Sequence, residues 1–440
     1  MSVLTFKGGV HPLGKKELSK TKKIISYLPG SEVVIPVSQH IGAPAEVIVN
    51  KGDRVLAGQL IAKANGFISA NVHSSVSGEV VAIEDRMVLN DNKCKCIIIK
   101  NDDLYEPVPI TDFRKPEELT REDIIELVKE AGVVGMGGAG FPTHVKLSPK
   151  NPNAIRYIIV NGAECEPYLT SDYRRMLEDA DIIVEGLQIV LSMFPKAKGY
   201  IAIEDNKLDA IKLLKDKTKK IPNIQVKEVY TKYPQGGERS LIYALTKKEI
   251  NSSMLPADAG CIVQNIDTIH AIYEAVVNKR PLIDRIVTVT GEAIKKPQNY
   301  KVPIGVMYED LIKEAGGFDK MPPKIVSGGP MMGIALSRTD IPVTKGTSAI
   351  LCLEKDEAAV KESNCISCGR CLNACPQKLV PTLLAKAATH GDKETFIKLN
   401  GMECCECGCC TYACVAKRNL TQSIKSIKKE IIADRRKASS

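Results

Sequence analysis

The amino-acid sequence predicts a multidomain protein of mixed α/β and α+β class, with four small domains arranged along 440 residues. Three observations lead to this prediction. Short apolar runs separated by glycine turns occupy the first hundred residues, strand and helix patterns alternate in the middle, and cysteines cluster near the end. The sequence contains no run of about 18 apolar residues, so no membrane-spanning helix is expected.

The first domain is expected at residues 31–106, after a basic, extended arm at residues 1–30. Residues 49–62 and 73–83 have the pattern of short strands joined by glycine turns. These two halves resemble the barrel-sandwich fold of lipoyl and biotinyl carrier domains, which present a modified lysine at a hairpin tip. The corresponding region, residues 68–75, contains no lysine. A docking or structural module is therefore expected here instead of a carrier.

Residues 117–282 are predicted to form a Rossmann-like domain with a parallel sheet. Thr120 is expected to cap its first helix, with Asp123 at the capping-box position. Beyond that helix, strands are expected at residues 156–160, 199–204 and 224–229, with helices near 173–193 and 206–219. Such alternation is typical of parallel strands joined by right-handed crossovers.

Two further domains and a tail are expected after residue 282. Residues 283–345 read as a β-grasp unit of the ubiquitin-like type, with a hairpin-like pair and then a helix at 307–315. A cysteine-rich domain is expected at 352–420, followed by a basic tail at 421–440. The tail has Ile424, Ile427, Ile431 and Ile432 along one side of a short helix. We expect a solvated, frayed terminus; docking on a membrane partner or on lipid headgroups is the alternative.

Eight cysteines repeat one spacing, C-x2-C-x2-C-x3-C, and a proline follows the first run. The two runs are Cys365, Cys368, Cys371, Cys375 and Cys404, Cys407, Cys410, Cys414. This spacing indicates two [4Fe–4S] clusters in an α-helical ferredoxin domain, in which the fourth cysteine of each run binds the other cluster. One cluster is thus assigned to Cys365, Cys368, Cys371 and Cys414, and the other to Cys404, Cys407, Cys410 and Cys375. Zinc is the alternative for paired C-x2-C motifs, and two complete runs disfavour it.

The remaining composition limits the compartment and the partners. Fifteen cysteines behind an N-terminus without an apolar signal region indicate a reducing compartment and metal binding. Cys405 and Cys409 fall inside the second run and could line its cluster. A net charge of +9 suits nucleic acid, an anionic membrane surface or acidic partners. Nucleic acid is disfavoured because only 5% of the residues are aromatic and tryptophan is absent.

A glycine-rich segment at residues 135–146 reads GMGGAGFPTHVK. Its glycines let the backbone approach a phosphate or a flat ring, and Lys146 adds a positive charge. The segment matches neither the Walker A loop nor G-x-G-x-x-G. On its residues alone it is either an anion site or a tight packing turn.

Polar residues follow the predicted strands, at the edge where α/β proteins bind ligands. Asn161, Glu164 and Glu166 come directly after the first strand, and their amide and carboxylate groups suit a ring edge and sugar hydroxyls. Two more turns, YPQGGE at 233–238 and VQNIDT at 263–268, add glycines and amides. These segments together predict a nucleotide-like ligand.

The segment GMGGAGFPTHVKL is similar to GRGGAGFPTGLKW, the flavin loop of the NADH-binding flavoprotein subunit of respiratory complex I. NGAECEP, YPQGGE and QNIDT resemble that family's NADESEP, YICGEE and NNVET. The closer resemblance is to the RnfC proteins of the Rnf ion-translocating oxidoreductases. Those proteins combine this flavin domain with an N-terminal HPxxxK segment (His11 to Lys16 here), a barrel-sandwich domain, a β-grasp unit (GGPMMGIAL here) and twin cluster motifs. The resemblance covers nearly the whole chain.

The resemblance implies non-covalent FMN and NAD(H) as substrate. The expected FMN residues are Gly135, Gly137, Gly138, Lys146, Asn161, Glu164, Tyr233, Gly236, Asn265 and Thr268. Phe141, Glu166 and Glu238 would lie on the dinucleotide side. Two residues depart from complex I, because Met136 replaces its loop arginine and Ala163 replaces an aspartate of its dinucleotide motif.

The resemblance further implies a peripheral subunit of a membrane Rnf complex, on the cytoplasmic face of the membrane. It would exchange electrons between NAD(H), FMN and two [4Fe–4S] clusters, with the other subunits as partners and ferredoxin as an indirect one. No catalytic acid–base pair is expected. One alternative is the corrin-reducing flavoprotein of propanediol utilisation, whose barrel-sandwich unit follows the clusters. Another is a non-enzymatic electron-wire subunit, which Met136 and Ala163 favour.

Overall fold

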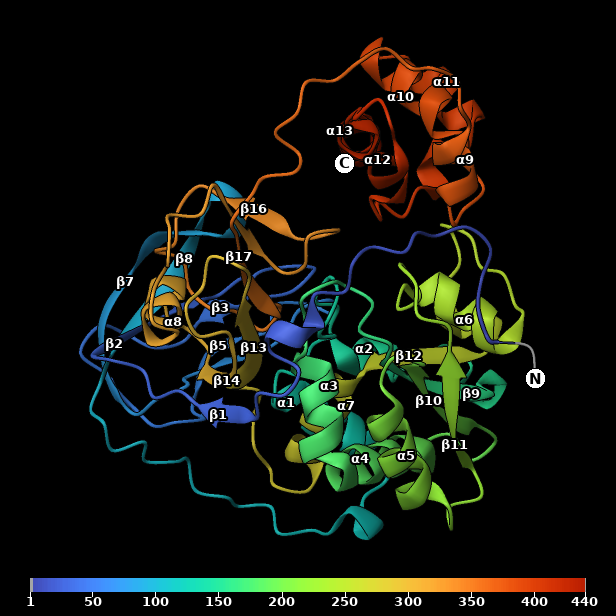
Figure 1. Ribbon diagram of the computed structural model, residues 1–440. Helices are drawn as coiled ribbons and strands as arrows, with labels where there is room; N and C mark the ends of the chain where they lie inside the picture. The colour runs from blue at the N-terminus through green and yellow to red at the C-terminus, as the bar shows by residue number, and fades with distance from the viewer. Residues whose placement is uncertain (1–2, 440) are drawn as a thin grey trace.

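A four-stranded parallel sheet lies near the middle of the chain in the computed structural model, which describes residues 3–439 (Figure 1). Its strand order is β11–β10–β9–β12. The strands are β9 (Tyr157–Gly162), β10 (Lys198–Glu204), β11 (Ile224–Val229) and β12 (Cys261–Asn265). Every neighbouring pair is parallel, so the prediction of a parallel sheet is confirmed. The carboxyl ends of β9, β10 and β12 carry the candidate site.

Seven helices accompany this sheet. They are α1 (Arg121–Glu130), α2 (Thr143–Lys146), α3 (Ser171–Glu178), α4 (Ala180–Ser192), α5 (Leu208–Thr218), α6 (Glu238–Thr246) and α7 (Ile266–Val276). Thr120 caps α1 together with Asp123, as the sequence predicts. The helical stretch expected near 173–193 is present, and Asp179 leaves helical geometry and divides it into α3 and α4.

Two antiparallel sheets form the domain that follows the arm. One has the order β2–β8–β7–β4 and the other β3–β5–β6. The strands are β2 (Glu32–Pro36), β3 (Glu46–Val47), β4 (Arg54–Val55), β5 (Leu60–Lys63), β6 (Val72–His73), β7 (Gly78–Val88) and β8 (Asn92–Asn101). Val33, Ile61 and Ile97, from strands of both sheets, are fully buried in a common core.

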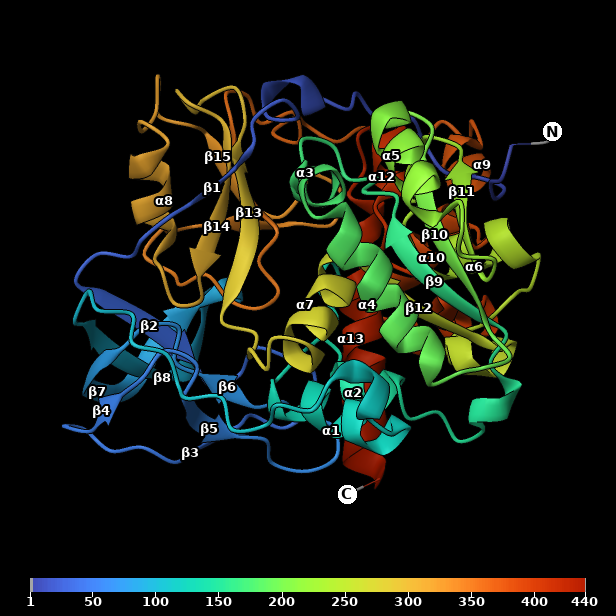
Figure 2. The ribbon, with the colours of Figure 1, turned by 90° about the horizontal axis from the view of Figure 1, so that it is seen from below.

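A six-stranded mixed sheet has the order β1–β14–β13–β17–β15–β16. Its elements are β1 (Ile24–Ser26), β13 (Asp284–Thr290), β14 (Gln298–Pro303), β15 (Lys324–Ser327), β16 (Ile334–Leu336), β17 (Ala349–Leu353) and the helix α8 (Tyr308–Glu314). β1 comes from the N-terminal arm and pairs in parallel with β14. β17 lies past residue 345, where the sequence places the end of this unit, because its apolar run is a central strand. Figure 2 shows this sheet and the barrel-sandwich domain together on one side of the parallel sheet.

The cysteine-rich domain is helical and lies beside α6 at one end of the molecule (Figure 1), where Arg239 pairs with Glu403. Its helices are α9 (Arg370–Ala374), α10 (Pro381–Thr389), α11 (Lys393–Lys398), α12 (Cys409–Ala413) and α13 (Leu420–Ser439). The expected solvated tail is wrong, since α13 packs along α10 and buries Ile424, Ile427 and Ile431 beside Phe396. Apolar residues at helical spacing supply a packing face, which outweighs the basic character of the segment.

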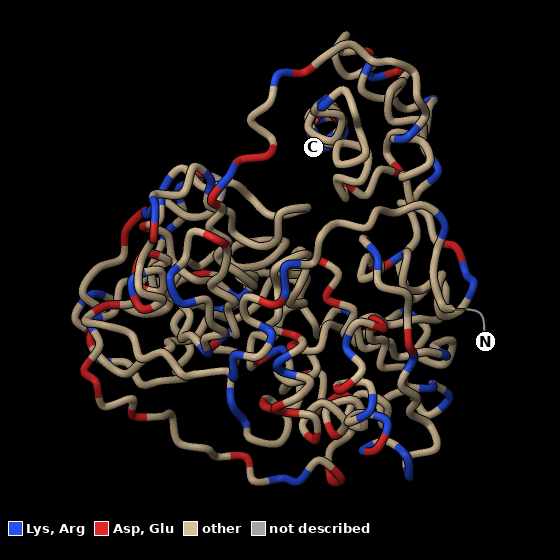
Figure 3. The backbone as a smooth tube through the Cα atoms, viewed as in Figure 1, with Lys and Arg blue, Asp and Glu red and all other residues tan. Residues whose placement is uncertain are grey.

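Short 3-10 helices connect several of these elements: η1 (Lys16–Leu18), η2 (Leu89–Asp91), η3 (Pro116–Glu118), η4 (Pro152–Ala154), η5 (Pro256–Ala259) and η6 (Gly401–Glu403). Within residues 3–439, no helix is both long and apolar enough to cross a membrane. Figure 3 shows lysine and arginine interspersed with aspartate and glutamate along the chain. The positive net charge is therefore spread over many parts of the chain.

Candidate functional site

The glycine loop between α1 and α2 is held against the carboxyl end of β12. The Met136 backbone N–H donates to Thr268 Oγ1 at 2.9 Å, which ties the loop to the first turn of α7. Gly137 has a φ of +72° and lies so close to Asn265 that a Cβ would come 2.9 Å from its Nδ2. Only glycine suits both the left-handed backbone and this close approach. The structure thus brings together Gly137, Asn265 and Thr268, as expected.

The apex of this loop faces open space. Gly137, Gly138 and Ala139 are exposed, and a Cβ built on Gly138 would meet no atom within 4 Å. A flat ring or a phosphate can therefore approach the backbone at Gly138 without meeting protein. The loop fits the cradle that FMN requires.

Asn161 joins the end of β9 to the loop that follows β11. Its Nδ2 donates to the Gly236 carbonyl at 2.8 Å, and its Oδ1 accepts from the Ala163 N–H at 3.2 Å. The Gly236 N–H points at Cys165 Sγ, 3.3 Å away. Asn161 and Gly236, both expected at FMN, are therefore neighbours at the sheet edge, and Cys165 is an additional residue of this group.

Lys146 and Glu238 form an ion pair with Nζ and Oε1 3.2 Å apart, on partly exposed side chains. Lys146 also donates to the Val263 carbonyl at 3.2 Å. The sequence assigns Lys146 to a phosphate and Glu238 to the dinucleotide side. The pairing places the two groups side by side, so a phosphate at Lys146 would share this cation with the carboxylate.

Glu164 is held by protein groups on two sides. Its Oε1 accepts from the Asp172 N–H at 2.8 Å at the start of α3, and its Oε2 lies 3.5 Å from Lys16 Nζ. Asp172 itself accepts from Asn265 Nδ2 at 2.6 Å. Burial raises the pKa of Asp172 to about 8, and the neighbouring Glu164 and Asp267 carboxylates add to the rise. The HPLGKK motif could have indicated Lys16 as a residue of this site. No motif in the sequence indicates Asp172.

Glu166 faces the β-grasp unit. Its carboxylate accepts from the N–H groups of Met331 and Met332 at 3.1 and 2.9 Å. Burial raises the pKa of Glu166 to about 7, against the opposing effect of these two N–H groups. Glu166 follows the Asn161–Glu164 segment, as expected. Its carboxylate, however, is hydrogen-bonded to the backbone of the loop between β15 and β16. Phe141, the other residue expected on that side, is half-buried.

Several buried polar atoms at this sheet edge have no partner among the described residues. They are Glu204 Oε1, both amide atoms of Gln264 and the Tyr233 hydroxyl. Buried polar atoms are nearly always hydrogen-bonded in native proteins. Lys207, which donates to the Ala163 carbonyl at 2.7 Å, is the neighbouring cation of Glu204. Unpartnered groups in this place fit a polar ligand. Gln264 lies in the amide-bearing turn at 263–268, whereas sequence reasoning missed Glu204 and Lys207.

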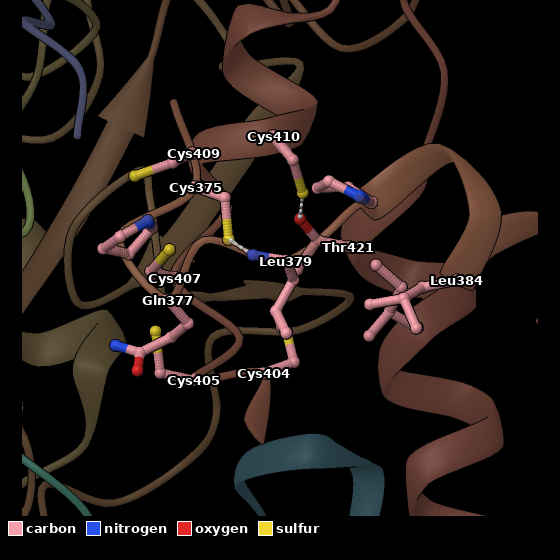
Figure 4. A pocket seen from close by; sticks show the side chains of 14 residues that line it. Cys375, Gln377, Leu379, Leu384, Cys404, Cys405, Cys407, Cys409, Cys410 and Thr421 are labelled. Atoms are coloured by element: carbon pink, nitrogen blue, oxygen red, sulfur yellow. Dashed lines mark hydrogen bonds between the residues drawn. The ribbon is translucent and has the colours of Figure 1, made fainter. Parts of the chain in front are cut away.

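Six cysteines line one cavity in the helical domain (Figure 4). They are Cys375, Cys404, Cys405, Cys407, Cys409 and Cys410. Four of these form the set that the crossed assignment gives to one cluster, with Cys375 contributed by the first run. Cys375 Sγ accepts from the Leu379 N–H at 3.3 Å, and Cys410 Sγ lies 3.4 Å from Thr421 Oγ1. The cavity therefore has the thiols that a [4Fe–4S] cluster requires.

The other expected set is more open. Cys365 and Cys368 are exposed on a loop without regular structure. Cys371 is buried, and its side chain belongs to a group of packed apolar side chains that includes Cys410 and Cys414. Between residues 3 and 439, no three His, Cys, Asp or Glu side chains converge on a position for a single metal ion. A cubane cluster is bound by one thiolate at each of several irons, so its ligands do not converge in that way.

The cysteine cavity adjoins the flavin side of the sheet through Tyr233. This side chain is almost fully buried and packs with Val10, Cys407 and Cys409. Cys409 Sγ lies 3.8 Å from the Tyr233 carbonyl. The N-terminal arm passes between the two domains (Figure 1), where the Val10 N–H donates to the Tyr233 carbonyl at 2.8 Å. Gly236, three residues after Tyr233, therefore lies near both parts of the site.

Three family models match the chain. The Nuo51 FMN-binding domain matches residues 128–274, the RnfC barrel sandwich hybrid domain matches residues 4–104, and the SLBB domain matches residues 286–335. These matches agree with the expected barrel-sandwich, flavin and β-grasp units in that order.

Curated relatives match over nearly the whole chain. A subunit of the proton-translocating ferredoxin:NAD(+) oxidoreductase complex of Clostridium ljungdahlii is 47% identical over 97% of this chain and 94% of its own length. The corresponding protein of the Na(+)-translocating complex of Acetobacterium woodii is 44% identical over 98% of both. A third relative, from the ion-translocating oxidoreductase complex of Vibrio cholerae, is 37% identical over 90% of this chain and 52% of its own length.

Among solved structures, an air-oxidized NAD+-reducing [NiFe]-hydrogenase matches 70% of this chain and 63% of its own, with a TM-score of 0.51 and 18% identity. That likeness concerns the fold. The domain order, the family models and the full-length relatives agree, and the chain belongs to the RnfC family of proteins from ion-translocating ferredoxin:NAD oxidoreductase (Rnf) complexes.

Proposed function

We propose that this chain is the peripheral NADH/FMN/iron–sulfur subunit of a membrane-bound, ion-translocating ferredoxin:NAD oxidoreductase. It exchanges electrons between NAD(H), non-covalent FMN and two [4Fe–4S] clusters. Its partners are the other subunits of the complex, and ferredoxin is an indirect one. It acts at the cytoplasmic face of the membrane. The family membership and the FMN-binding domain match support this proposal.

One observation carries the proposal: the cysteine cavity adjoins the Tyr233–Gly236 turn, which is hydrogen-bonded to Asn161 at the carboxyl end of β9. Tyr233 packs on Cys407 and Cys409, and the loop it begins reaches Gly236 and Asn161. Nicotinamide transfers two electrons as hydride, a [4Fe–4S] cluster transfers one, and flavin exchanges with both. A subunit that couples these carriers needs flavin and cluster sites close to each other, and the contact between the cysteine cavity and this sheet edge supports such an arrangement.

The residues of this chain have holding and orienting roles in the proposal. Gly137 and Gly138 leave backbone space for the FMN ring system, and Asn161 and Asn265 hold the two strand ends on which it rests. Lys146 is the cation for its phosphate. Cys375, Cys404, Cys407 and Cys410 bind the cluster nearer to the flavin. Cys365, Cys368, Cys371 and Cys414 bind the cluster at the exposed end, where electrons pass to or from a partner.

Anaerobic purification followed by cofactor extraction tests the proposal. Acid precipitation should release FMN into the supernatant, and iron analysis should give about eight irons per chain. Zinc in place of iron would refute the cluster assignment. NADH should bleach the flavin absorbance and drive ferricyanide reduction. Bleaching by dithionite but not by NADH would identify an electron-wire subunit instead.

A further inference from the structure

The barrel-sandwich domain places its tip directly against the glycine loop. The tip consists of residues 39–43 and 65–70, which pair through the Ala43 N–H and the Ile68 carbonyl at 3.1 Å. The Ile41 N–H donates to the Gly140 carbonyl of the loop at 3.2 Å. A Cβ built on Gly140 would come 3.3 Å from His40 Cα. The tip and the flavin loop are therefore in contact with no spare space between their backbones.

A second contact orients the end of the tip. The His144 ring, on the helix directly after the glycine loop, lies beside the backbone of Phe67. His144 is buried, whereas the Phe67 side chain is 71% exposed. The backbone of Phe67 thus lies next to the flavin domain while its ring projects into solvent. Ile41 and Ile68, also on the tip, are 46% and 40% exposed.

Exposed apolar residues that lie together, as Ile41, Phe67 and Ile68 do on the tip, mark a binding surface more often than single exposed residues do. Carrier domains of the same fold present a modified lysine in this region, and this chain presents an aromatic ring instead. The tip contacts Gly140, and the next residue of the loop is Phe141, which the resemblance places on the dinucleotide side. An aromatic face stacks on any nucleobase because every base has a π-face.

We propose that Phe67 forms the adenine wall of the dinucleotide site, so that the barrel-sandwich tip contributes to substrate binding. This inference rests on the proposed function. The nicotinamide half must reach the flavin at the open face of Gly138, and the adenine half then extends to a neighbouring surface. The tip is a surface in direct contact with the loop, and Phe67 is its most exposed aromatic group.

Steady-state kinetics of Phe67→Ala with two substrates tests this inference. Reduced nicotinamide mononucleotide carries the reactive ring but lacks adenine, so it serves as the internal control for NADH. KM for NADH should rise about 5- to 100-fold, the factor expected for one lost base stack. KM for the mononucleotide and kcat with either substrate should stay within about two-fold. Inhibition by ADP-ribose, which carries only the adenine half, should weaken by the same factor as NADH binding.

Three further measurements separate this outcome from a structural defect. Phe67→Trp should restore KM for NADH, and Phe113→Ala, at an 82% exposed aromatic of the linker, should change nothing. FMN content and melting temperature should be the same in all variants. An unchanged KM for NADH, or an equal rise for both substrates, would overturn the inference and leave the tip as a surface for a partner protein. If NADH does not reduce the wild-type flavin, the proposed function fails, and this inference with it.

Discussion

Glu166→Gln probes the contact between the flavin domain and the β-grasp unit. The native carboxylate accepts two backbone N–H groups, from Met331 and Met332, in a buried place. Gln keeps the shape and one acceptor oxygen, but its NH2 group faces a backbone N–H that it cannot accept. The loss of one such hydrogen bond costs about 1 kcal/mol. The more informative effect is the change in pH dependence.

The pKa of Glu166 is raised by burial from 4.5 to about 7. Between these values the folded protein holds a proton that the unfolded chain has released, so this group's contribution to folding stability falls as pH rises through the window. The shift corresponds to about 3 kcal/mol. A glutamine at this position binds no proton, so the folding stability of the variant does not fall with pH through this group. The stability advantage of wild type over the variant should therefore be largest near pH 5 and should shrink, or reverse, by pH 8.

Melting curves of the two holoproteins across this pH range measure the effect. Glu394→Gln, at an exposed carboxylate on α11, is the matched control and should follow the wild type at each pH. Parallel curves for Glu166→Gln and wild type would refute the reasoning. So would a rise in KM for NADH without any change in the curves, because the carboxylate would then serve the substrate and not the loop.

Three further substitutions test the cofactor sites and the tail helix. Gly138→Val should abolish FMN retention, because the side chain would occupy the open space at the loop apex, while Gly30→Val, also in open space, should retain FMN. Cys375→Ala should lower the iron content from about eight to about four per chain and remove the EPR signal of the cluster held by Cys404, Cys407 and Cys410, whereas loss of the other signal would refute crossed ligation. Ile427→Asp should destabilise the helical domain by about 3 kcal/mol or more and shorten the lifetime of its cluster absorbance, with exposed Lys429→Ala unchanged.

Local patterns in the sequence were sufficient for much of this architecture. The strands β9, β10 and β11 were predicted from short β-branched runs, and α1 from its capping box, because such signals lie within a few residues. The cysteine runs indicated their chemistry by spacing alone. The helical character of 171–192 was predicted, but the point of division between α3 and α4 was not, because Asp179 has no breaker residue beside it. The tail was misjudged because its charge was weighed above its apolar periodicity.

Contacts between distant segments could not be read in the same way. Glu166 was expected to face a substrate, and its partners Met331 and Met332 lie 165 and 166 residues further on. Lys16 reaches the carbonyl of the same Glu166 from the N-terminal arm at 3.1 Å. The sequence pattern predicts which polar side chains lie at the carboxyl edge of the sheet. Which groups another domain has already partnered depends on tertiary packing.

The two departures from the complex I flavoprotein bear on the electron-wire alternative. Met136 is only 5% exposed and contacts the Arg285 guanidinium, and Ala163 is fully buried, with its carbonyl held by Lys207. Neither side chain faces solvent at the loop apex, so an arginine or aspartate at these positions would enter packed interior. The complex I arginine and aspartate are thus replaced by buried apolar side chains. Met136 lies beside Arg285, and Ala163 lies beside Lys207. Because burial accounts for both residues, their presence gives no support to a subunit that has lost its dinucleotide.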